Sequence, residues 1–301
     1  MAPRPARLPP PVLPGARVGV AALSGYVDPA ALTRGLAGLV SLGFEPVPAG
    51  NLGSRWGVFA GGDAERLAAF HALAADPSLA AIFFARGGYG LPRLLPGIDW
   101  DLLAAVPRAY VGYSDVTPFL LQVVARLGLV AFHGPMVASD LARGLGGEEV
   151  ESLLACLAGR LPRVLPVPLA IRAGEAEGVL LGGCLSLLAA VTGTPWQADL
   201  TGSILFLEDI GEPAYRIDRM LTHLHLSGSL AALHGLVLGD LGEGWRDGAP
   251  GAWQLEAVRQ VEGPVGAGLP CGHTAPNLTL PLGVRAVLDV AGGRLELLSE
   301  R

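Results

Sequence analysis

The segment RAYVGYSDVTPFLL, residues 108–121, contains the turn around which the rest of the sequence is organised. A short apolar run ends at Gly112, and Tyr113, Ser114 and Asp115 then lead into a helical pattern of apolar residues. This order predicts a strand, a tight turn and a helix start with Ser114 at the apex, where backbone N–H groups and the helix dipole favour negative charge. Ser114 is therefore either a nucleophile on a strand-to-helix elbow, although G-Y-S-D differs from G-x-S-x-G, or only the cap of the helix.

Composition bounds the classes of protein to which this chain of 301 residues can belong. Apolar residues make up 51% and charged residues 16%, which provides for a large core and excludes wholesale disorder. A net charge of −6 without a basic block predicts no nucleic-acid partner. The three cysteines are too scattered for a disulfide framework or a zinc knuckle, which favours a reducing compartment.

Neither an export signal nor a membrane span is predicted. The prolines at positions 9–11 stand where a signal peptide needs an apolar core, so a cytoplasmic location is expected. Residues 178–198 carry no charge and approach the length of a membrane span, but Gly182, Gly183 and Pro195 interrupt them. We therefore expect the end of a strand followed by a buried helix, and no membrane partner.

Strand-like and helix-like segments alternate through the first half of the chain. The expected strands are residues 17–23, 44–47, 80–85, 109–111 and 130–133, and the expected helices include residues 28–42 and 63–75. This alternation is typical of parallel β-α-β units, so we expect an α/β domain with a flavodoxin-like parallel sheet. Ligand sites in such sheets lie beyond the carboxyl ends of the strands, where both RGGYG (residues 86–90) and Ser114 occur.

The composition changes after a helical pattern at residues 148–158. Residues 161–171 contain three prolines, which is typical of a linker or an edge strand. Short β-like runs with longer gaps follow at residues 178–181, 203–207, 235–238 and 286–290. We therefore expect residues 1–155 to form the domain with the serine, residues 156–170 a linker, and residues 171–301 a smaller domain of mixed β/α structure.

A serine nucleophile needs a base, an orienting carboxylate and an oxyanion hole. Among six histidines His273 is the best candidate base, because the turn-rich loop PCGHT leaves it free to reach into a cleft. His133 follows an apolar run and is expected to be buried and hydrogen-bonded instead. The candidate carboxylate is Glu208, at the end of the apolar run ILFL; the alternative is that Glu208 only starts a loop whose acids pair with Arg216 or Arg219.

A series of short motifs extends over nearly the whole chain. These motifs are AGGD at residues 60–63 with Arg66, DP at 76–77, ARGGYG at 85–90, GYSDVT at 112–117, FHGP at 132–135, GTPW at 193–196, LEDIGE at 207–212 with YRIDR at 215–219, and GH at 272–273. In this order they resemble the LD-carboxypeptidases, a family of serine peptidases that includes muramoyltetrapeptide carboxypeptidase and the microcin C self-immunity peptidases.

The resemblance implies a catalytic triad of Ser114, Glu208 and His273 in a cleft between the two domains. It also implies an oxyanion hole formed by the backbone N–H groups of Asp115 and Gly88, where glycine lets the backbone approach a substrate closely. The implied reaction is hydrolysis of an L,D-peptide bond without metal or cofactor, which releases the C-terminal D-alanine of murein tetrapeptides in peptidoglycan recycling. A homodimer is implied as well.

Arg86, Gly87 and Tyr113 are candidate substrate-binding residues beside these motifs. A carboxypeptidase must bind a free carboxylate, for which Arg86 is suited; an ion pair between Arg86 and an acid across the domain interface is the alternative. The chain departs from the family pattern at Cys184, where many relatives have asparagine. Because Cys184 begins an apolar helix and has no adjacent basic residue, we expect a buried structural cysteine and not a nucleophile.

Two other functions are compatible with parts of the sequence. An immunity-type peptidase or amidase would cleave peptidyl- or aminoacyl-nucleotide conjugates with the same triad, and Trp245 and Trp253 would hold the base. A non-catalytic flavodoxin-like module would hold a phosphate with residues 86–90, although the chain has no Walker pattern. The first alternative predicts turnover of a nucleotide conjugate, and the second predicts nucleotide binding that survives Ser114→Ala.

Overall fold

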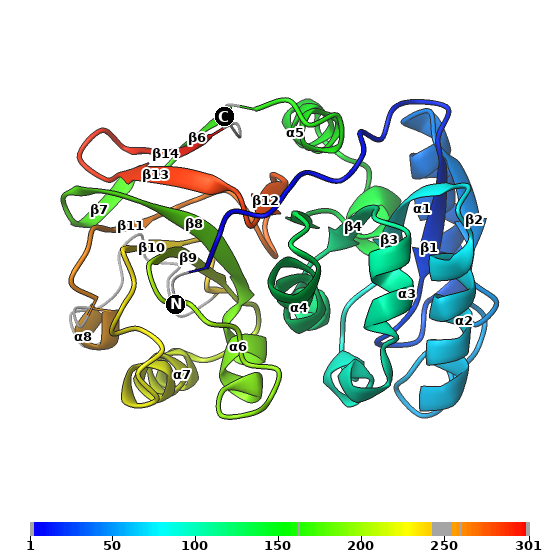
Figure 1. The fold of residues 1–301 in the computed structure, drawn as a ribbon, viewed down its shortest axis with the longest axis horizontal. Helices are drawn as coiled ribbons and strands as arrows, with labels where there is room; N and C mark the ends of the chain where they lie inside the picture. Colours follow the sequence, from blue (N-terminus) through cyan, green and yellow to red (C-terminus); the bar gives the residue numbers. More distant parts are fainter. Residues whose placement is uncertain (1–2, 162, 243–254, 259–260, 299–301) are drawn as a thin grey trace.

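The computed structural model describes residues 3–161, 163–242, 255–258 and 261–298, which form two β-sheets that stand side by side (Figure 1). The first sheet contains β1 (Arg17–Ala21), β2 (Glu45–Pro48), β3 (Leu79–Phe84), β4 (Ala109–Gly112), β5 (Ala131–His133) and β12 (Leu280–Leu282). Its order is β12-β5-β4-β3-β1-β2; β1 to β5 are parallel, and β12 is antiparallel to β5. The order of β1 to β5 is that of flavodoxin-like sheets, so the predicted fold class is confirmed for this part.

The second sheet is mixed, as predicted. Its strands are β6 (Arg163–Pro166), β7 (Leu169–Arg172), β8 (Glu175–Cys184), β9 (Ser203–Glu208), β10 (Gly235–Leu238), β11 (Val265–Ala267), β13 (Arg285–Asp289) and β14 (Arg294–Leu297), in the order β6-β14-β13-β8-β9-β10-β11-β7. The four strands β8 to β11 are parallel, and the others pair antiparallel. The prolines of residues 161–171 predicted either a linker or an edge strand, and β6 is an edge strand of this sheet.

Helices cover the first sheet and the lower side of the second sheet in Figure 1. They are α1 (Pro29–Ser41), α2 (Asp63–Ala75), α3 (Trp100–Ala105), α4 (Thr117–Leu127), α5 (Gly147–Leu157), α6 (Leu185–Val191), α7 (Ala214–Leu226) and α8 (Leu255–Val258), with the short turns η1 (Leu91–Arg93), η2 (Leu95–Gly97), η3 (Ser114–Val116) and η4 (Val137–Leu141). Because β1, β3 and β4 lie between helices, their apolar runs are buried almost throughout.

Local sequence determines where α1 begins and why it lies close to η4. Asp28 caps α1 by accepting a hydrogen bond from the Ala31 amide at 2.8 Å, and Pro29 follows at the first helical position. Within α1, a Cβ on Gly35 would lie 1.9 Å from the carbonyl oxygen of Val137 in η4. The helix can therefore approach η4 this closely only because position 35 is glycine.

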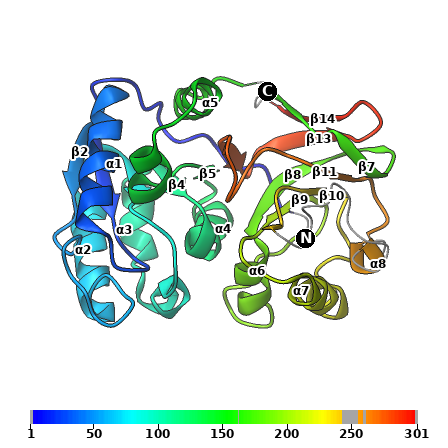
Figure 2. The ribbon, with the colours of Figure 1, turned by 180° about the vertical axis from the view of Figure 1, so that it is seen from behind.

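Three segments join the two halves of the molecule. The strand β12, which is distant in sequence from β5, pairs with it so that Leu280 lies opposite His133. At the end of β8 the Cys184 amide donates to the Thr117 hydroxyl at the start of α4, at 3.1 Å. The N-terminal segment crosses both halves, with the Ala6 amide donating to the Gly283 carbonyl at 2.8 Å (Figure 2).

The division expected from the sequence differs from these pairings at two places. The expected linker, residues 156–170, contains β6 and the start of β7, both strands of the second sheet. The strand β12 falls in the expected C-terminal domain, residues 171–301, but is the edge strand of the first sheet. Residues 178–198 form the end of β8 and then α6, as predicted, and none of the helices in the described part of the chain is long and apolar enough to span a membrane.

Candidate active site

Ser114 stands on a strained turn between β4 and α4. Its φ of 63° makes it the one non-glycine residue with a positive φ in the described part of the chain. Such a left-handed conformation is costly for a residue with a Cβ and persists only where the surrounding structure imposes it. An ordinary N-cap has extended backbone and needs no such strain. The turn therefore has the backbone signature of a nucleophile elbow, half-exposed at the carboxyl end of the sheet.

His273 and Glu208 form a direct pair. The distance from His273 Nδ1 to Glu208 Oε2 is 2.7 Å, and the backbone N–H of His273 donates to the same oxygen at 3.1 Å. The Glu208 side chain is fully buried, while 15% of the His273 side chain is exposed. The loop that Glu208 starts does contain an acid that pairs with Arg216, but this acid is Glu212 and not Glu208.

The chain path explains why these two residues meet. Glu208 is the last residue of β9, and His273 lies in the loop that leads into β12. A Cβ on Gly272 would lie 2.4 Å from Glu208 Oε2, so a glycine with φ of 104° is required for the loop to pass the carboxylate. The pairing of β12 with β5 then holds this loop beside the carboxyl end of the first sheet.

Tyr113 connects the His273–Glu208 pair to the serine turn. Its ring meets the His273 ring edge to face, with the centroids 4.8 Å apart, and Ser114 is the next residue in the chain. The Tyr113 hydroxyl donates to Asp140 at 3.4 Å. The serine turn, which follows Tyr113 directly, therefore lies near the His273–Glu208 pair.

The environment of His273 favours its protonated form. Burial lowers the pKa of the imidazole, but the hydrogen bond and charge of Glu208, with the charges of Asp209 and Asp140, outweigh this effect and raise the pKa above its usual value. If Nδ1 carries the hydrogen that is shared with Glu208, the lone pair of Nε2 is left to accept a proton.

The glycine loop after β3 lies directly against the serine. A Cβ on Gly87 would lie 2.8 Å from both Cβ and Oγ of Ser114, and 3.4 Å from the Asp115 nitrogen. Gly88 is exposed, and no hydrogen bond from its amide or from that of Asp115 is found within the described residues. Two backbone donors thus remain available at the two sides of the serine turn.

Arg86 does not form the ion pair that was one of its two expected roles. No acid among the described residues pairs with it; its Nη1 donates to the Tyr26 carbonyl at 3.0 Å, which leaves the charge of the guanidinium uncompensated. Its side chain is half-buried in the same loop as Gly87 and Gly88. A guanidinium that has no acidic partner among the described residues, next to the candidate oxyanion donors, is compatible with binding a carboxylate.

An open cavity of about 370 Å³ borders His273. Its lining residues are Tyr113, Ser139, Asp140, Arg143, Ile210, His273, Thr274 and Ala275. Asp140 is almost buried, and Arg143 lies 3.7 Å from it and 2.7 Å from Glu149. Asp140 and Arg143 were not predicted from the sequence, because neither lies in a motif and η4, which carries Asp140, was not expected.

Cys184 and His133 are both buried beside this site. Burial and the nearby charges of Glu208 and Asp209 raise the pKa of the Cys184 thiol well above its usual value, which opposes thiolate formation, as expected for a structural cysteine. His133 is fully buried, as expected. The prediction that it is also hydrogen-bonded is wrong for the described residues, because neither ring nitrogen has a hydrogen-bond partner among them. Its ring packs instead against Tyr113 and Phe206.

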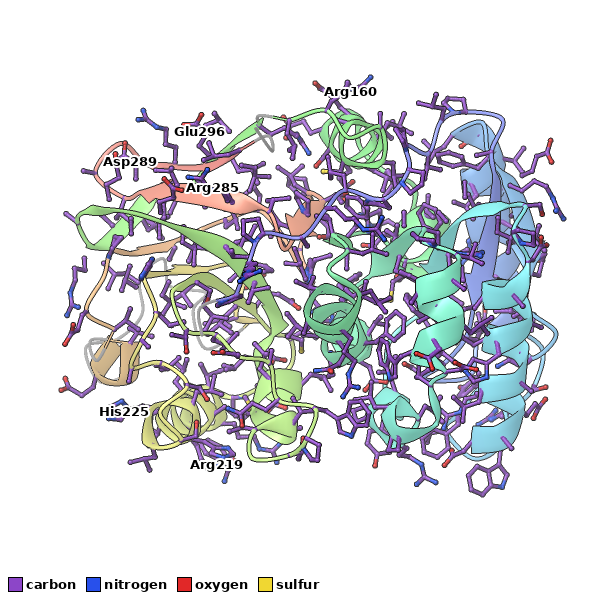
Figure 3. All side chains as sticks on the ribbon, in the orientation of Figure 1. Arg160, Arg219, His225, Arg285, Asp289 and Glu296 are labelled. Carbon is purple, nitrogen blue, oxygen red and sulfur yellow. The ribbon has the colours of Figure 1, made fainter. Side chains whose placement is uncertain are left out.

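No group of three or more His, Cys, Asp or Glu side chains in the described part of the chain is arranged to hold a metal ion. The labelled His225 lies on α7, at the lower left of Figure 3, on the side of the molecule away from the first sheet. Trp245 and Trp253, considered for a base-binding surface, lie outside the described residues.

Two family models match most of the chain. The model of the LD-carboxypeptidase N-terminal domain matches residues 18–134, and that of the LD-carboxypeptidase C-terminal domain matches residues 177–288. The chain belongs to the LD-carboxypeptidase family. Membership in this family of serine peptidases makes it a serine-type carboxypeptidase, and it confirms the family that the sequence motifs indicated.

Individual relatives agree with this assignment. A Streptomyces coelicolor protein named as a carboxypeptidase is 41% identical over 316 residues, which cover 98% of this chain and 96% of the relative. The crystal structure of muramoyltetrapeptide carboxypeptidase from Oxalobacter formigenes is similar with a TM-score of 0.83 and 34% identity over 95% of this chain and 99% of that one. The microcin C7 self-immunity protein MccF in complex with aspartyl sulfamoyl adenosine has a TM-score of 0.88 and 25% identity over 98% and 99% of the two chains.

Proposed function

We propose that this LD-carboxypeptidase hydrolyses the L,D-peptide bond of murein tetrapeptides and releases their C-terminal D-alanine. The observation that carries the proposal is the His273–Glu208 pair at 2.7 Å beside the strained Ser114 turn. A base that is oriented by a carboxylate, next to a serine on an elbow, is the arrangement needed for acyl transfer through a covalent intermediate. The names of the murein peptide carboxypeptidases among the relatives support the choice of substrate.

In the proposed mechanism Ser114 Oγ attacks the carbonyl carbon of the L-configured diamino acid while His273 Nε2 accepts its proton. Glu208 orients the imidazole and stabilises the imidazolium. The oxyanion accepts hydrogen bonds from the backbone N–H groups of Asp115 and Gly88. The C–N bond then breaks, D-alanine leaves with the proton from His273, and water hydrolyses the acyl-enzyme with His273 again as base.

The surroundings of the triad offer two places for the rest of the substrate. The uncompensated guanidinium of Arg86 is suited to the carboxylate of D-alanine. The cavity that borders His273 presents Asp140 and Arg143, charges of both signs, to the side chain of the diamino acid. Gly87 is too closely packed against Ser114 to do more than form the wall of the site.

Release of free D-alanine from a murein tetrapeptide tests this proposal directly. We expect release by the wild type and a loss of at least about 10³-fold in Ser114→Ala, which removes the nucleophile. Ser41→Ala is the matched control, because the one hydrogen bond of the Ser41 hydroxyl among the described residues is donated to the Gly38 carbonyl within α1. A folded wild type without D-alanine release, or equal release by wild type and Ser114→Ala, would contradict the proposal.

The likeness to MccF favours a second candidate function, cleavage of aminoacyl-nucleotide conjugates with the same triad. The same three proteins would be assayed with an aminoacyl sulfamoyl adenylate. Turnover of this conjugate without release of D-alanine from the tetrapeptide would replace the first proposal by the second. We also propose a cytoplasmic homodimer, for which light scattering on the purified protein and cell fractionation are the tests.

A further inference from the structure

The glycine loop of residues 86–90 has to be held in place by contacts from outside it. It has no helix or strand of its own, and Gly88 and Gly90 have φ values of 104° and 122°. Glycines of this kind give the backbone more freedom than any other residue. A hydrogen-bond donor for an oxyanion is effective only when its position is fixed before the reaction. Groups outside the loop must therefore fix it relative to Ser114.

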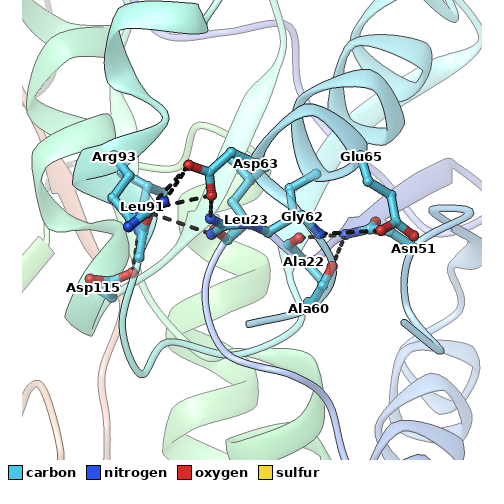
Figure 4. Close-up of polar contacts among 12 residues, drawn as sticks. Ala22, Leu23, Asn51, Ala60, Gly62, Asp63, Glu65, Leu91, Arg93 and Asp115 are labelled. Carbon is cyan, nitrogen blue, oxygen red and sulfur yellow. Dashed lines mark hydrogen bonds and ion pairs between the residues drawn. The ribbon is translucent and has the colours of Figure 1, made fainter. Parts of the chain in front are cut away.

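Arg66 of α2 is one such group. Its side chain is fully buried, and Nη1 donates to the Leu23 carbonyl after β1 and to the Gly90 carbonyl at 3.4 Å. Nη2 forms an ion pair at 2.5 Å with Asp63, which in turn pairs at 2.8 Å with Arg93 of η1 (Figure 4). A buried guanidinium that is compensated in this way fixes the end of the glycine loop to the loop after β1.

The carboxylate of Asp115 is the other group. It is 1% exposed, and its Oδ2 accepts a hydrogen bond from the Leu91 amide at 2.8 Å (Figure 4). Burial raises the pKa of this carboxyl group, while the nearby Ser24 hydroxyl and the backbone at Leu91 and Gly90 act in the opposite direction. The residue that follows the nucleophile therefore holds the first residues beyond the glycine loop.

We propose that Arg66 and the Asp115 carboxylate are positioning residues that fix the glycine loop and so place the Gly88 amide opposite the Asp115 amide. One residue, Asp115, then provides one oxyanion donor from its backbone and anchors the segment with the other donor through its side chain. Because both anchors meet at Gly90 and Leu91, loss of either frees the same end of the loop. This inference rests on the proposed function, since it assigns Gly88 and Asp115 to the oxyanion hole.

Arg66→Lys and Asp115→Asn are the variants that test it. Lysine keeps the charge of Arg66 but cannot reach two carbonyls and a carboxylate at once. Asparagine keeps the shape of Asp115 but loses the charge that strengthens its hydrogen bond from the Leu91 amide. Displacement of one oxyanion donor is expected to lower kcat by about 10- to 100-fold and to leave KM nearly unchanged, since the donor acts in the transition state.

Arg108→Lys is the matched control. Arg108 is also a buried arginine of the first domain, and it donates to the carbonyls of Leu73, Ala74 and Asp76 at 3.1, 2.8 and 3.0 Å. These carbonyls lie at the end of α2 and do not contact the glycine loop. Arg108→Lys should therefore lower the melting temperature, as Arg66→Lys does, without lowering kcat at a temperature at which each variant is folded.

The rate at which a fluorophosphonate modifies Ser114 provides a second readout that does not need the natural substrate, because its phosphoryl oxygen occupies the oxyanion position. We expect slow modification of Arg66→Lys and Asp115→Asn and a wild-type rate for Arg108→Lys. Wild-type rates and kcat in both variants would overturn the positioning role alone. A wild type that the reagent does not modify at Ser114 would overturn the assignment of the nucleophile, and the positioning role with it.

Discussion

At the scale of single residues, Gly87 lies directly against the candidate nucleophile. A Cβ at this position would lie 2.8 Å from Ser114 Oγ, closer than real Cβ atoms come to their neighbours. We expect Gly87→Ala to push the hydroxyl or the loop aside and to lower kcat by about 100-fold, while overpacking costs about 1–3 kcal/mol of stability. D-alanine release and urea unfolding of the same preparation measure both effects.

The control for this substitution is Gly53→Ala, because a Cβ on Gly53 meets nothing within 4 Å. It should keep wild-type kcat. Wild-type activity in Gly87→Ala would show that the serine is not confined by the glycine loop, and would contradict the arrangement of the site that is described above.

The raised pKa of His273 predicts a particular pH profile. A general base acts in its neutral form, so kcat/KM should rise with pH through the raised pKa, with a midpoint above the usual histidine value of about 6.5. Glu208→Gln removes the charge that raises this pKa, so the rise should move to lower pH while the maximal rate falls by about 10³- to 10⁴-fold.

Glu212→Gln is the matched control for Glu208→Gln, because Glu212 lies four residues further on and pairs only with Arg216 among the described residues. Its profile should follow that of the wild type. A Glu208→Gln profile with an unchanged midpoint would mean that Glu208 does not set the pKa of His273.

Single residues also show the limit of what the sequence predicts. Ser114, Glu208 and His273 could be found because each stands at the end of an apolar run or in a turn, and these local patterns survive in the sequence. Their assembly could not be read from such patterns and came from the family resemblance. Asp140 and Arg143 were not predicted, because only the folded chain places them on the cavity that borders His273.

At the scale of elements, the strands β1 to β5 and the helices α1 and α2 were predicted to within about two residues, and α2 spans Asp63–Ala75 as expected, whereas α3 was not predicted. The strand β12 was missed. It has three residues, one of them Pro281, and no alternating pattern. It forms only by pairing with β5, which is far away in the sequence, so no local pattern marks it. This non-local pairing is what brings His273 to the first sheet, so the missed element is the one that assembles the site.

The contact between α1 and η4 gives a prediction at this scale. Alanine in place of glycine within a helix stabilises it by about 1 kcal/mol, but a Cβ on Gly35 would lie 1.9 Å from the Val137 carbonyl oxygen. Since backbone atoms must move, we expect the clash to outweigh the gain and Gly35→Ala to unfold at lower urea concentration than the wild type. Gly147→Ala, at a helical glycine with open space around it, should be neutral or stabilising. If Gly35→Ala were instead the more stable of the two variants, helix propensity would outweigh the clash at Gly35.

At the scale of the whole molecule, His133 links the two sheets through its ring and not through hydrogen bonds. It is fully buried at the end of β5 and packs edge to face on Phe206 of β9, with centroids 5.1 Å apart. Burial, with a smaller effect of the charge of His273, lowers the pKa of His133 to about 3. The imidazole is therefore neutral in the folded protein throughout the physiological range.

Because the pKa of His133 is lowered, the contact between the two sheets is sensitive to acid. Below about pH 6.5 the unfolded chain binds a proton at His133 that the folded chain does not, so the free energy of unfolding should fall by up to about 1.4 kcal/mol per pH unit down to the folded pKa. At pH 5 this amounts to about 2 kcal/mol relative to pH 7. His133→Phe should lose this part of the slope, which urea unfolding at both pH values measures.

Phe132→Leu separates packing from titration, because Phe132 is as deeply buried in the same strand and carries no titratable group. It should lower the free energy of unfolding by the same amount at pH 7 and pH 5, so that its pH dependence runs parallel to that of the wild type. The free energy of unfolding of His133→Phe should instead depend less steeply on pH, whatever its value at pH 7. Equal slopes for wild type and His133→Phe would mean that His133 takes up its proton without unfolding, and that the interface between the two sheets admits the charge.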